Sequence, residues 1–411
     1  MSEKWRVIQR TYLVLLLLHT LAASFIWGIN TLFLLDAGLS NAQAFAANAF
    51  FTAGLVLFEV PTGVIADLRG RRLSYLLGTL TLTISTVAYL WMWRIKAPFW
   101  AWALVSVFLG LGFTFFSGAV QAWLVDALKA SGYQGELDAV FAKGEIIEGV
   151  AMLGGSVTGG VIAQFTNLGV PYILRAIVLG ATFVLAFFLM HDVGFEPKHT
   201  TVRGVLGGAM RYGLRNPPVR WMMLANIFTD GVSIYAFYAA QPYLLQLWGD
   251  PKAYWIAGLA AAIVGGAQIG GGLLVPHLAR FFRRRTSTLL AAVIASTIIL
   301  GTVGLMRNFW TVIALLVLWG LIFAIVMPVR QAYVNELIPS DQRATVLSFD
   351  SLMGSAGGVG AQPILGRAAD VWGYPMSYVC SAGIQALAIP FVWLARRAGA
   401  DVEKRSSHST S

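Results

Sequence analysis

Long apolar runs recur along the whole chain, and they constrain its fold more than any other feature. A helix needs about 20 residues to cross the hydrocarbon core of a bilayer, because that core is about 30 Å thick. Twelve runs reach this length: residues 11–35, 43–66, 73–94, 98–128, 138–165, 170–190, 219–247, 254–279, 286–306, 308–338, 343–369 and 375–396. The sequence therefore predicts an all-α membrane protein with twelve transmembrane helices. It lacks the ten-residue alternating segments that are typical of a membrane β-barrel.

The small share of charged side chains supports this prediction. Charged residues make up 12% of the 411-residue chain and hydrophobic residues 57%, whereas soluble domains average about 25% and about 45–50%. A chain of this composition is expected to have lipid as its main solvent. The single cysteine, Cys380, excludes an intrachain disulfide and a zinc site built from cysteines. The sequence predicts no metal site.

The distribution of lysine and arginine predicts the orientation, because basic residues gather in the cytoplasmic loops of membrane proteins. If the N-terminus and every second loop lie on one side, that side holds 22 of the 29 Lys and Arg residues. The opposite loops hold Arg94, Lys96, Lys252 and Arg307. Both termini are therefore expected in the cytoplasm, with the chain in a plasma membrane of the bacterial type. The formal charge of +10 is spread over these loops, which favours contact with anionic lipid and argues against nucleic acid as a partner.

The second half of the chain repeats the first. QAWLVD at 121–126 matches QAYVNE at 331–336, a shift of 210 residues, and GGVIAQ at 159–164 matches GGVGAQ at 357–362, a shift of 198. Two six-helix halves in the same orientation are the architecture of transporters in which one half rocks against the other. A duplicated bundle without transport is the alternative.

The longest hydrophilic segment divides the chain nearly in half. We expect an N-terminal six-helix bundle at 1–190, a cytoplasmic linker at 191–218, a C-terminal six-helix bundle at 219–400 and a polar cytoplasmic tail at 401–411.

The stretch GVIADLRGRR at 63–72 resembles the signature between helices 2 and 3 of the major facilitator superfamily. That signature has a glycine, three apolar or small residues, an aspartate, two variable residues, a glycine, an arginine and a further basic residue. Gly63, Asp67, Gly70, Arg71 and Arg72 fill its fixed places. The twelve spans and the repeat extend the resemblance over essentially the whole chain. It implies two pseudo-symmetric six-helix bundles that alternate between inward-open and outward-open states.

The same resemblance implies a conformational latch at the cytoplasmic face. In the family the aspartate of the signature approaches the start of helix 11, and a loop arginine reaches an acid near the end of helix 4, here Asp126. Such contacts would hold the outward-open state, and a proton on Asp67 or Asp126 would release it. Glu336 with one of the arginines at 283–285 would be the equivalent contact of the second half. The alternative is that the loop arginines only anchor the loop in the cytoplasm.

The stretch GSVTGG at 155–160 is similar to the Gly-Pro-x-x-Gly-Gly signature of drug/proton antiporters in this family, with Ser156 in the place of the proline. This similarity points to the twelve-helix antiporter branch. Glycines in apolar helices also allow close helix packing, whatever the substrate. The glycines expected to pack in this way are Gly155, Gly159, Gly160, Gly357 and Gly358.

Acids inside the predicted spans are the candidates for proton coupling. A charge in the bilayer costs about 2.5–3.5 kcal/mol on insertion scales, so each one needs a partner, a water path or a function. The candidates are Asp230, Glu148, Glu59 and Asp36. Asp230 suits the role best, because helix 7 lines the central cavity in the family. Each acid could instead be structural and pair with an arginine.

Polar and aromatic residues of the same helices are candidates for lining the substrate cavity. They are Asn226, Tyr235, Tyr238, Trp123, Gln331, Tyr333 and Arg330. The aromatic members could stack on a hydrophobic or aromatic substrate. Arg330 could bind an anionic substrate or pair with a buried acid.

The sequence predicts a secondary active transporter and not an enzyme, because no Walker loop precedes a helix and no catalytic spacing of Ser, His and Asp is found. The leading hypothesis is proton-driven efflux of small hydrophobic compounds by antiport, with no cofactor and a proton gradient as energy source. Transport of a specific metabolite, such as a sugar, organic anion or lipid, is one alternative. A transport-inactive sensor on the same fold is another. We expect a monomer in the lipid bilayer with a small-molecule substrate.

Overall fold

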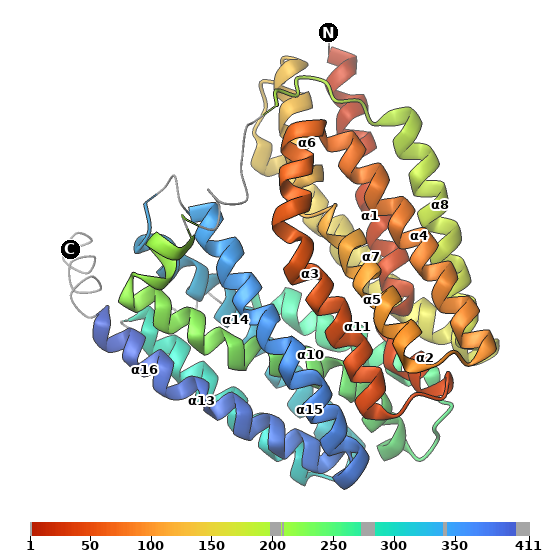
Figure 1. Cartoon of the computed structure of the whole chain (residues 1–411), viewed down its shortest axis with the longest axis vertical. Helices are drawn as coiled ribbons and strands as arrows, with labels where there is room; N and C mark the ends of the chain where they lie inside the picture. The colour runs from red at the N-terminus through yellow and green to blue at the C-terminus, as the bar shows by residue number, and fades with distance from the viewer. Residues whose placement is uncertain (1, 198–206, 208, 273–283, 340–342, 400–411) are drawn as a thin grey trace. The chain divides into compact units, whose positions relative to one another are not determined.

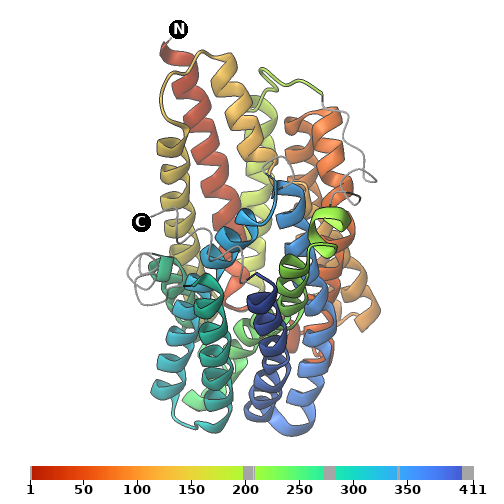
Figure 2. The ribbon, with the colours of Figure 1, turned by 90° about the vertical axis from the view of Figure 1, so that its left-hand side faces the viewer.

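The computed structural model describes residues 2–197, 207, 209–272, 284–339 and 343–399, and these residues form helices and no strands (Figures 1 and 2). In the first half of the chain the helices are α1 (Ser2–Trp27), α2 (Asn30–Asp36), α3 (Asn41–Arg69), α4 (Arg71–Ile95), α5 (Phe99–Thr114), α6 (Ala119–Ala130), α7 (Leu137–Phe165) and α8 (Gly169–Leu189). In the second half they are η1 (Ala209–Leu214), α10 (Pro217–Trp248), α11 (Tyr254–Gly272), α13 (Arg285–Leu305), α14 (Phe309–Glu336), α15 (Arg343–Ala386) and α16 (Ala388–Ala398).

Each of the twelve predicted spans overlaps helical residues. Nine stretches of the described chain are long and apolar enough to cross a membrane. The last of them, Val346–Ala398, holds two predicted spans, because Gly373 (φ 81°, ψ 167°) breaks the helix there. The predicted spans at 219–247 and 254–279 correspond to α10 and α11, of which α11 is described as far as Gly272.

Two predicted spans are broken by short turns. The span at 98–128 forms α5 and α6, and Gly118 before α6 has a left-handed conformation with φ 67°. The span at 11–35 forms α1 and α2. Gly70, with φ 105°, separates α3 from α4. Glycine adopts such positive φ angles without strain because it has no Cβ.

The chain divides into two compact units. Unit 1 consists of Met1–Leu39, Phe50–Val202 and Asp250–Ala262, and unit 2 consists of Ser40–Ala49, Arg203–Gly249 and Ile263–Ser411. Each unit is therefore mostly one half of the chain. The first turns of α3 group with unit 2 and the first turns of α11 group with unit 1. The predicted tail at 401–411 lies outside the described residues.

The two units repeat a close helix pairing. In unit 1, α1 packs on α7, and in unit 2, α10 packs on α15. A side chain at Gly159 of α7 would collide with the carbonyl oxygen of Phe25 in α1. Gly357 of α15 lies in the same way on the carbonyl oxygen of Ile227 in α10. These two glycines are matched by the 198-residue repeat, so the repeat in the sequence is also a repeat in the packing.

Three further glycines of the predicted set lie at helix contacts. Gly155 of α7 lies against Ser24 of α1, and Gly160 of α7 lies against Gly258 of α11. Gly358 of α15 faces Ile234 of α10, where a Cβ would come within 3.3 Å of the end of the Ile234 side chain, a tight contact.

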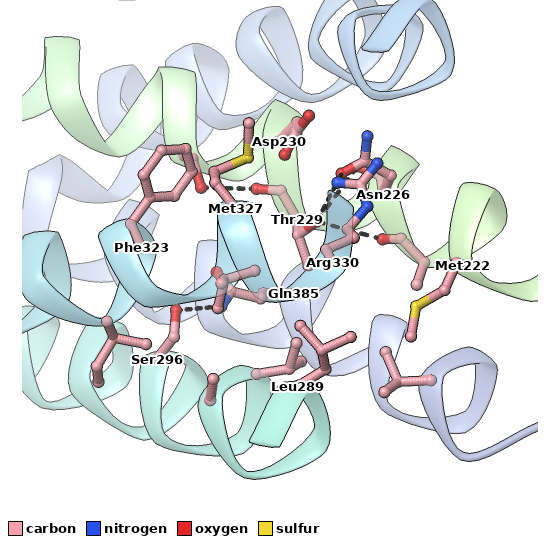
Figure 3. Close-up of a pocket in the computed structure, with 17 residues that line it drawn as sticks. Met222, Asn226, Thr229, Asp230, Leu289, Ser296, Phe323, Met327, Arg330 and Gln385 are labelled. Carbon is pink, nitrogen blue, oxygen red and sulfur yellow. Dashed lines mark hydrogen bonds between the residues drawn. The ribbon is translucent and has the colours of Figure 1, made fainter. Parts of the chain in front are cut away.

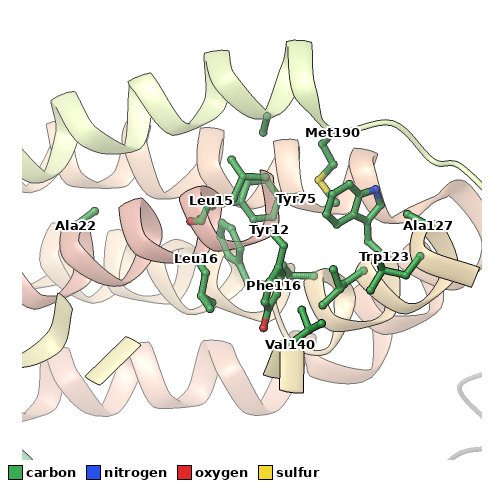
Figure 4. Close-up of a cluster of buried hydrophobic side chains, with 14 of the residues drawn as sticks. Tyr12, Leu15, Leu16, Ala22, Tyr75, Phe116, Trp123, Ala127, Val140 and Met190 are labelled. Atoms are coloured by element: carbon green, nitrogen blue, oxygen red, sulfur yellow. Dashed lines mark hydrogen bonds between the residues drawn. The ribbon is translucent and has the colours of Figure 1, made fainter. Parts of the chain in front are cut away.

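A large aromatic residue fills each core at matching positions. Figure 4 shows Tyr75 and Trp123 among the aliphatic side chains of the unit 1 core. Trp123 donates from Nε1 to the backbone oxygen of His191 at 2.7 Å. In the unit 2 core, the hydroxyl of Tyr333 donates to the backbone oxygen of Ala395 at 3.3 Å. The 210-residue repeat matches Trp123 with Tyr333: Trp123 bonds the segment that follows α8, and Tyr333 bonds α16.

Candidate functional site

Four polar side chains meet inside unit 2, and we call them the charge cluster: Asn226 and Asp230 of α10, Arg330 of α14 and Asp350 of α15. The Arg330 guanidinium donates to the carboxylate of Asp350 and to the side-chain oxygen of Asn226. Asn226 donates from Nδ2 to the backbone oxygen of Asp350 at 3.0 Å. The exposed fractions are 1% for Asn226, 5% for Asp350 and 9% for Arg330, so this ion pair is buried.

Helical spacing and one glycine bring the cluster together. Asn226 and Asp230 are four residues apart in α10, so their side chains share a face. Asp350 and Gly354 are four residues apart in α15 and share a face for the same reason. A side chain at Gly354 would collide with the carboxylate of Asp230 and with the amide of Asn226. The missing side chain of Gly354 therefore makes room for two polar groups of α10.

The charge cluster contains two carboxylates and one guanidinium. Arg330 is paired with Asp350. Asp230 makes no ion pair within 4.0 Å among the residues that the structure describes. With both acids ionised, the cluster carries one net negative charge. A proton or a cation bound at Asp230 would neutralise it and remove the cost of an uncompensated charge inside a membrane.

A pocket of about 580 Å³, including its open mouth, lies beside the charge cluster (Figure 3). Residues of α10, α13, α14, α15 and α16 line it. Asn226, Asp230 and Arg330 form a polar side, and most of the other lining residues are apolar. The residues labelled in the figure are Met222, Asn226, Thr229, Asp230, Leu289, Ser296, Phe323, Met327, Arg330 and Gln385.

Gln385 and Ser296 form a second polar spot in the lining of the pocket. Gln385 donates from Nε2 to the hydroxyl of Ser296. Two buried polar atoms of the lining residues, Gln385 Oε1 and Arg330 Nε, have no hydrogen-bond partner within the described chain. The pocket is therefore lined by two side chains whose hydrogen-bonding capacity is only partly used within the described chain. Small-molecule sites commonly combine a largely apolar lining with a few such polar groups.

The stretch at 63–72 comprises the end of α3, Gly70 and the start of α4, and its charged groups pair within unit 1. Arg71 Nη2 lies 2.7 Å from Asp67 Oδ1. Arg72 donates from its backbone amide to Asp192 Oδ1 at 2.9 Å, and from Nη2 to the backbone oxygen of Phe187 at 2.6 Å. Asp192 thus supplies the negative charge that stabilises the N-terminus of α4.

The other two predicted latch acids, Asp126 and Glu336, have different surroundings. Asp126 makes no ion pair with any residue that the structure describes, so the expected contact with a loop arginine is not formed in this conformation. Glu336 pairs with Arg285, one of its expected partners, and their side chains are 39% and 43% exposed. Arg283 lies outside the described residues. The role of these acids in switching between states stays a prediction.

The other acids predicted for proton coupling lie in unit 1. Glu59 accepts a hydrogen bond from the hydroxyl of Ser117, in the turn between α5 and α6. Asp36 accepts one from the indole of Trp93 at 2.7 Å. Glu148 is half-buried in α7. None of these three acids belongs to the charge cluster, and no group of acids, histidines or cysteines in the described chain could hold a metal ion.

Two of the predicted cavity residues, Asn226 and Arg330, line the pocket. Tyr238 is half-buried beside the ring of Phe237, and Gln331 is exposed.

Three aromatic residues predicted for the cavity are buried elsewhere. Tyr235 has no exposed surface, and its hydroxyl donates to Ser377 Oγ at 2.7 Å. Trp123 and Tyr333 belong to the hydrophobic cores of the two units. The structure therefore gives all three a packing role, and none of them lines the described pocket.

Asp350 was not among the predicted site residues, although the sequence carries a signal for it. Arg330 is a cation inside a predicted span, and such a cation needs a buried acid. The predicted spans at 343–369 and 219–247 contain one acid each, Asp350 and Asp230 respectively. The structure shows that Asp350 is the ion-pair partner.

The model of the Major Facilitator Superfamily matches residues 12–360 and 256–410 of this chain. The solved nucleoside transporter NupG has a similar structure, with a TM-score of 0.77 and 13% sequence identity over 94% of this chain and 98% of that chain. An aspartate-to-alanine mutant of NupG gives a TM-score of 0.80 at 13% identity, over 94% of this chain and 99% of that chain. No curated protein matches the sequence. Identity at this level shows the fold alone. The family match covers most of the chain, and the chain therefore belongs to the Major Facilitator Superfamily of multi-pass membrane transporters.

Proposed function

We propose that this protein is a proton-coupled antiporter that exports small amphiphilic cations. The observation that carries the proposal is the charge cluster of unit 2, where two carboxylates share one guanidinium beside a pocket with apolar walls. The similarity of GSVTGG at 155–160 to the antiporter signature supports export as the direction.

Asp230 is the residue that exchanges the two cations. Arg330 is already occupied by Asp350, so Asp230 is the acid left for a proton or a substrate cation. When a substrate cation arrives, the proton on Asp230 leaves to water, and the net charge of the cluster stays at zero. When the substrate leaves, a proton takes its place. One carboxylate that binds either cation, but not both, couples their movements in opposite directions.

The apolar walls of the pocket select the body of the substrate. Phe323 presents an aromatic ring, which attracts a cation by its face. Met222 and Met327 are flexible and adapt to differently shaped apolar groups. A hydrophobic body with one positive charge fits this lining better than a polyhydroxylated sugar or an organic anion, because an anion would meet the negative charge of the cluster.

Alternating access in this proposal is controlled by the ion pairs at the helix ends. Asp67 and Arg71 pair across the corner between α3 and α4, and Glu336 at the end of α14 pairs with Arg285 at the start of α13. We place the protein in the plasma membrane of a bacterial-type cell, because the basic loops follow the positive-inside pattern of such membranes.

The test uses purified protein in liposomes with an acidic lumen and ethidium, a fluorescent aromatic cation, outside. We expect ethidium to accumulate in the lumen while the pH gradient lasts. This accumulation should stop when an ionophore removes the gradient. Asp230→Asn should abolish the gradient-driven accumulation. Asp138→Asn is the matched control, because Asp138 is an exposed acid in the first turn of α7.

Three results would contradict the proposal. Gradient-driven ethidium flux that survives in Asp230→Asn would exclude Asp230 as the exchange site. Flux of a neutral nucleoside such as uridine without flux of ethidium would favour the metabolite alternative; uridine is included because NupG is a nucleoside transporter. Ethidium binding without flux of any probe would favour a sensor.

A further inference from the structure

The first turn of α3 is held by a side chain from the other half of the chain. The backbone amide of Asn41 donates to Asp370 Oδ1 at 2.9 Å, and the amide of Ala42 donates to Asp370 Oδ2 at 2.9 Å. Asp370 lies in α15, 329 residues further along the sequence than Asn41. All three residues lie in unit 2, with which the first turns of α3 group.

Asp370 completes an N-terminal cap that α3 provides only in part. The first amides of a helix have no partner within the helix. Ser40 and Gln43 form a reciprocal capping box: the amide of Ser40 donates to Gln43 Oε1 at 3.1 Å, and the amide of Gln43 donates to Ser40 Oγ at 3.3 Å. The amides of Asn41 and Ala42 lie between them, and the two carboxylate oxygens of Asp370 accept from these amides. A carboxylate at this position also gains from the helix dipole.

The surface of α15 around Asp370 is shaped for this turn of α3. Gly366 lies one helical turn before Asp370, and a Cβ there would come within 2.8 Å of the backbone oxygen of Asn41 and 3.0 Å of Phe45. The hydroxyl of Tyr374 donates to the side-chain oxygen of Asn41. These contacts form a seam that we call the α3–α15 seam, made of residues 41–45 on one side and 366–374 on the other.

A second seam joins the two halves of the chain in unit 1. Gly258 of α11 lies against Gly160 of α7 and against Gly28, and side chains at any of the three would collide with backbone atoms. Loop charges place the start of α3, the end of α7 and the start of α11 on the non-cytoplasmic side. Both seams therefore lie at the outer ends of their helices.

We infer that Asp370 is the polar lock of an outer gate, which is formed when the non-cytoplasmic side is closed and broken when that side opens. The contact needs two acceptor oxygens in register with two neighbouring amides, so a small separation of α3 from α15 breaks both hydrogen bonds together. The glycine contact of the second seam has no hydrogen bonds to lose. Asp370 thus contributes a discrete step to opening, and this role does not depend on which substrate is carried.

The test measures access to the α3–α15 seam from outside. In a background where Cys380 is replaced by serine, Phe45→Cys places a thiol in the seam, because Phe45 is fully buried there and packs on the ring of Tyr235 at 4.5 Å. Labelling of right-side-out vesicles with a membrane-impermeant maleimide reports how often the seam opens. Adding Asp370→Asn should raise the labelling rate about 3- to 10-fold, because an amide offers one acceptor where two are needed.

Two further variants make the result decisive. Asp250→Asn changes an exposed loop acid whose carboxylate accepts from the amide of Lys252, two residues away, so it should leave the labelling rate unchanged. Gly366→Leu should raise the rate as Asp370→Asn does, because it pushes α3 away while the carboxylate stays. The lock would be overturned if Asp370→Asn left the labelling rate unchanged while Gly366→Leu raised it. Both variants must be well folded for this comparison. Labelling unchanged in both variants would show that the seam does not open and would overturn the gate itself.

Discussion

Arg330 and Asp350 form the most buried ion pair among the described residues. Their side chains are 11% and 7% exposed, compared with 12% and 24% for Arg71 and Asp67. The pair joins α14 to α15 and lies beside Asp230, which has no such partner in the described chain. The guanidinium of Arg330 is therefore already paired, and Asp230 is the acid of the cluster without an ion-pair partner in the described chain.

Asp350→Ala is expected to destabilise the protein by about 3–5 kcal/mol, because it leaves the Arg330 charge buried without its partner. Thermal unfolding of purified protein measures the loss. Glu336→Ala is the comparison, since it removes an ion pair that is about two-fifths exposed, and such pairs contribute about 0–1 kcal/mol. If the two variants unfold at the same temperature, the buried ion pair contributes no more to stability than the exposed one.

Gly354→Ala is expected to reduce gradient-driven ethidium transport about tenfold, equivalent to about 1.4 kcal/mol. The added methyl group would collide with the Asp230 carboxylate and with Asn226, so it displaces the exchange site without changing its charge. Gly360→Ala is the matched control on the same helix, because a Cβ there meets nothing within 4 Å. Equal transport by both variants would show that the position of the carboxylate does not matter.

Binding of ethidium to detergent-solubilised protein is expected to release protons and acidify a weakly buffered solution. The sign follows from exchange at Asp230: the arriving cation takes the place of a proton, so the medium gains protons. Release should fall as the starting pH rises, because fewer protein molecules then carry the proton. A pH-indicator dye measures the change, and Asp230→Asn should abolish it.

Glu59→Gln tests whether the released proton comes from an acid of unit 1 or from Asp230 in unit 2. Glu59 lies in unit 1, bonded to Ser117, and is not part of the charge cluster. Proton release should persist in this variant. Release that disappears in Glu59→Gln and persists in Asp230→Asn would move the exchange site to unit 1.

The helices could be predicted from the sequence because only helices and closed barrels satisfy their backbone in lipid, and continuous apolar runs of about 20 residues fit helices and not barrel strands. Their ends were harder to place. The first run begins at Thr11, whereas α1 begins at Ser2, because a helix continues into water without an apolar signal. The turn at Gly118 was also not predicted, since glycine is common in unbroken membrane helices.

The candidate site could be predicted in part. Asn226, Asp230 and Arg330 could be predicted because polar and charged side chains are costly inside a membrane span and usually have a partner or a function there. The pairing of Arg330 with Asp350 depends on how α14 and α15 pack, which sequence spacing does not specify. Trp123 and Tyr333 were predicted to line a cavity because an aromatic residue gives the same sequence signal whether it faces a cavity or a core.

Asp67→Asn is expected to reduce transport severalfold while leaving expression and folding intact. In this structure Asp67 pairs with Arg71 across the bend at Gly70, and in the latch hypothesis it changes partners when the protein changes state. The amide variant keeps the size of the side chain and removes its charge, so it weakens every ion pair that Asp67 makes. Counterflux of ethidium and the thermal unfolding temperature are measured on the same preparation.

Asp192→Asn tests whether a purely structural change at the same place has the same effect. Asp192 accepts from the backbone amide of Arg72 in the first turn of α4 and thereby stabilises that helix, a role worth about 0.5–2 kcal/mol. This variant should therefore unfold at a lower temperature but keep most of its transport, whereas Asp67→Asn should lose transport at an unchanged unfolding temperature. If both variants lose transport and stability together, the loop acts by holding the α3–α4 corner in shape, and the latch hypothesis fails.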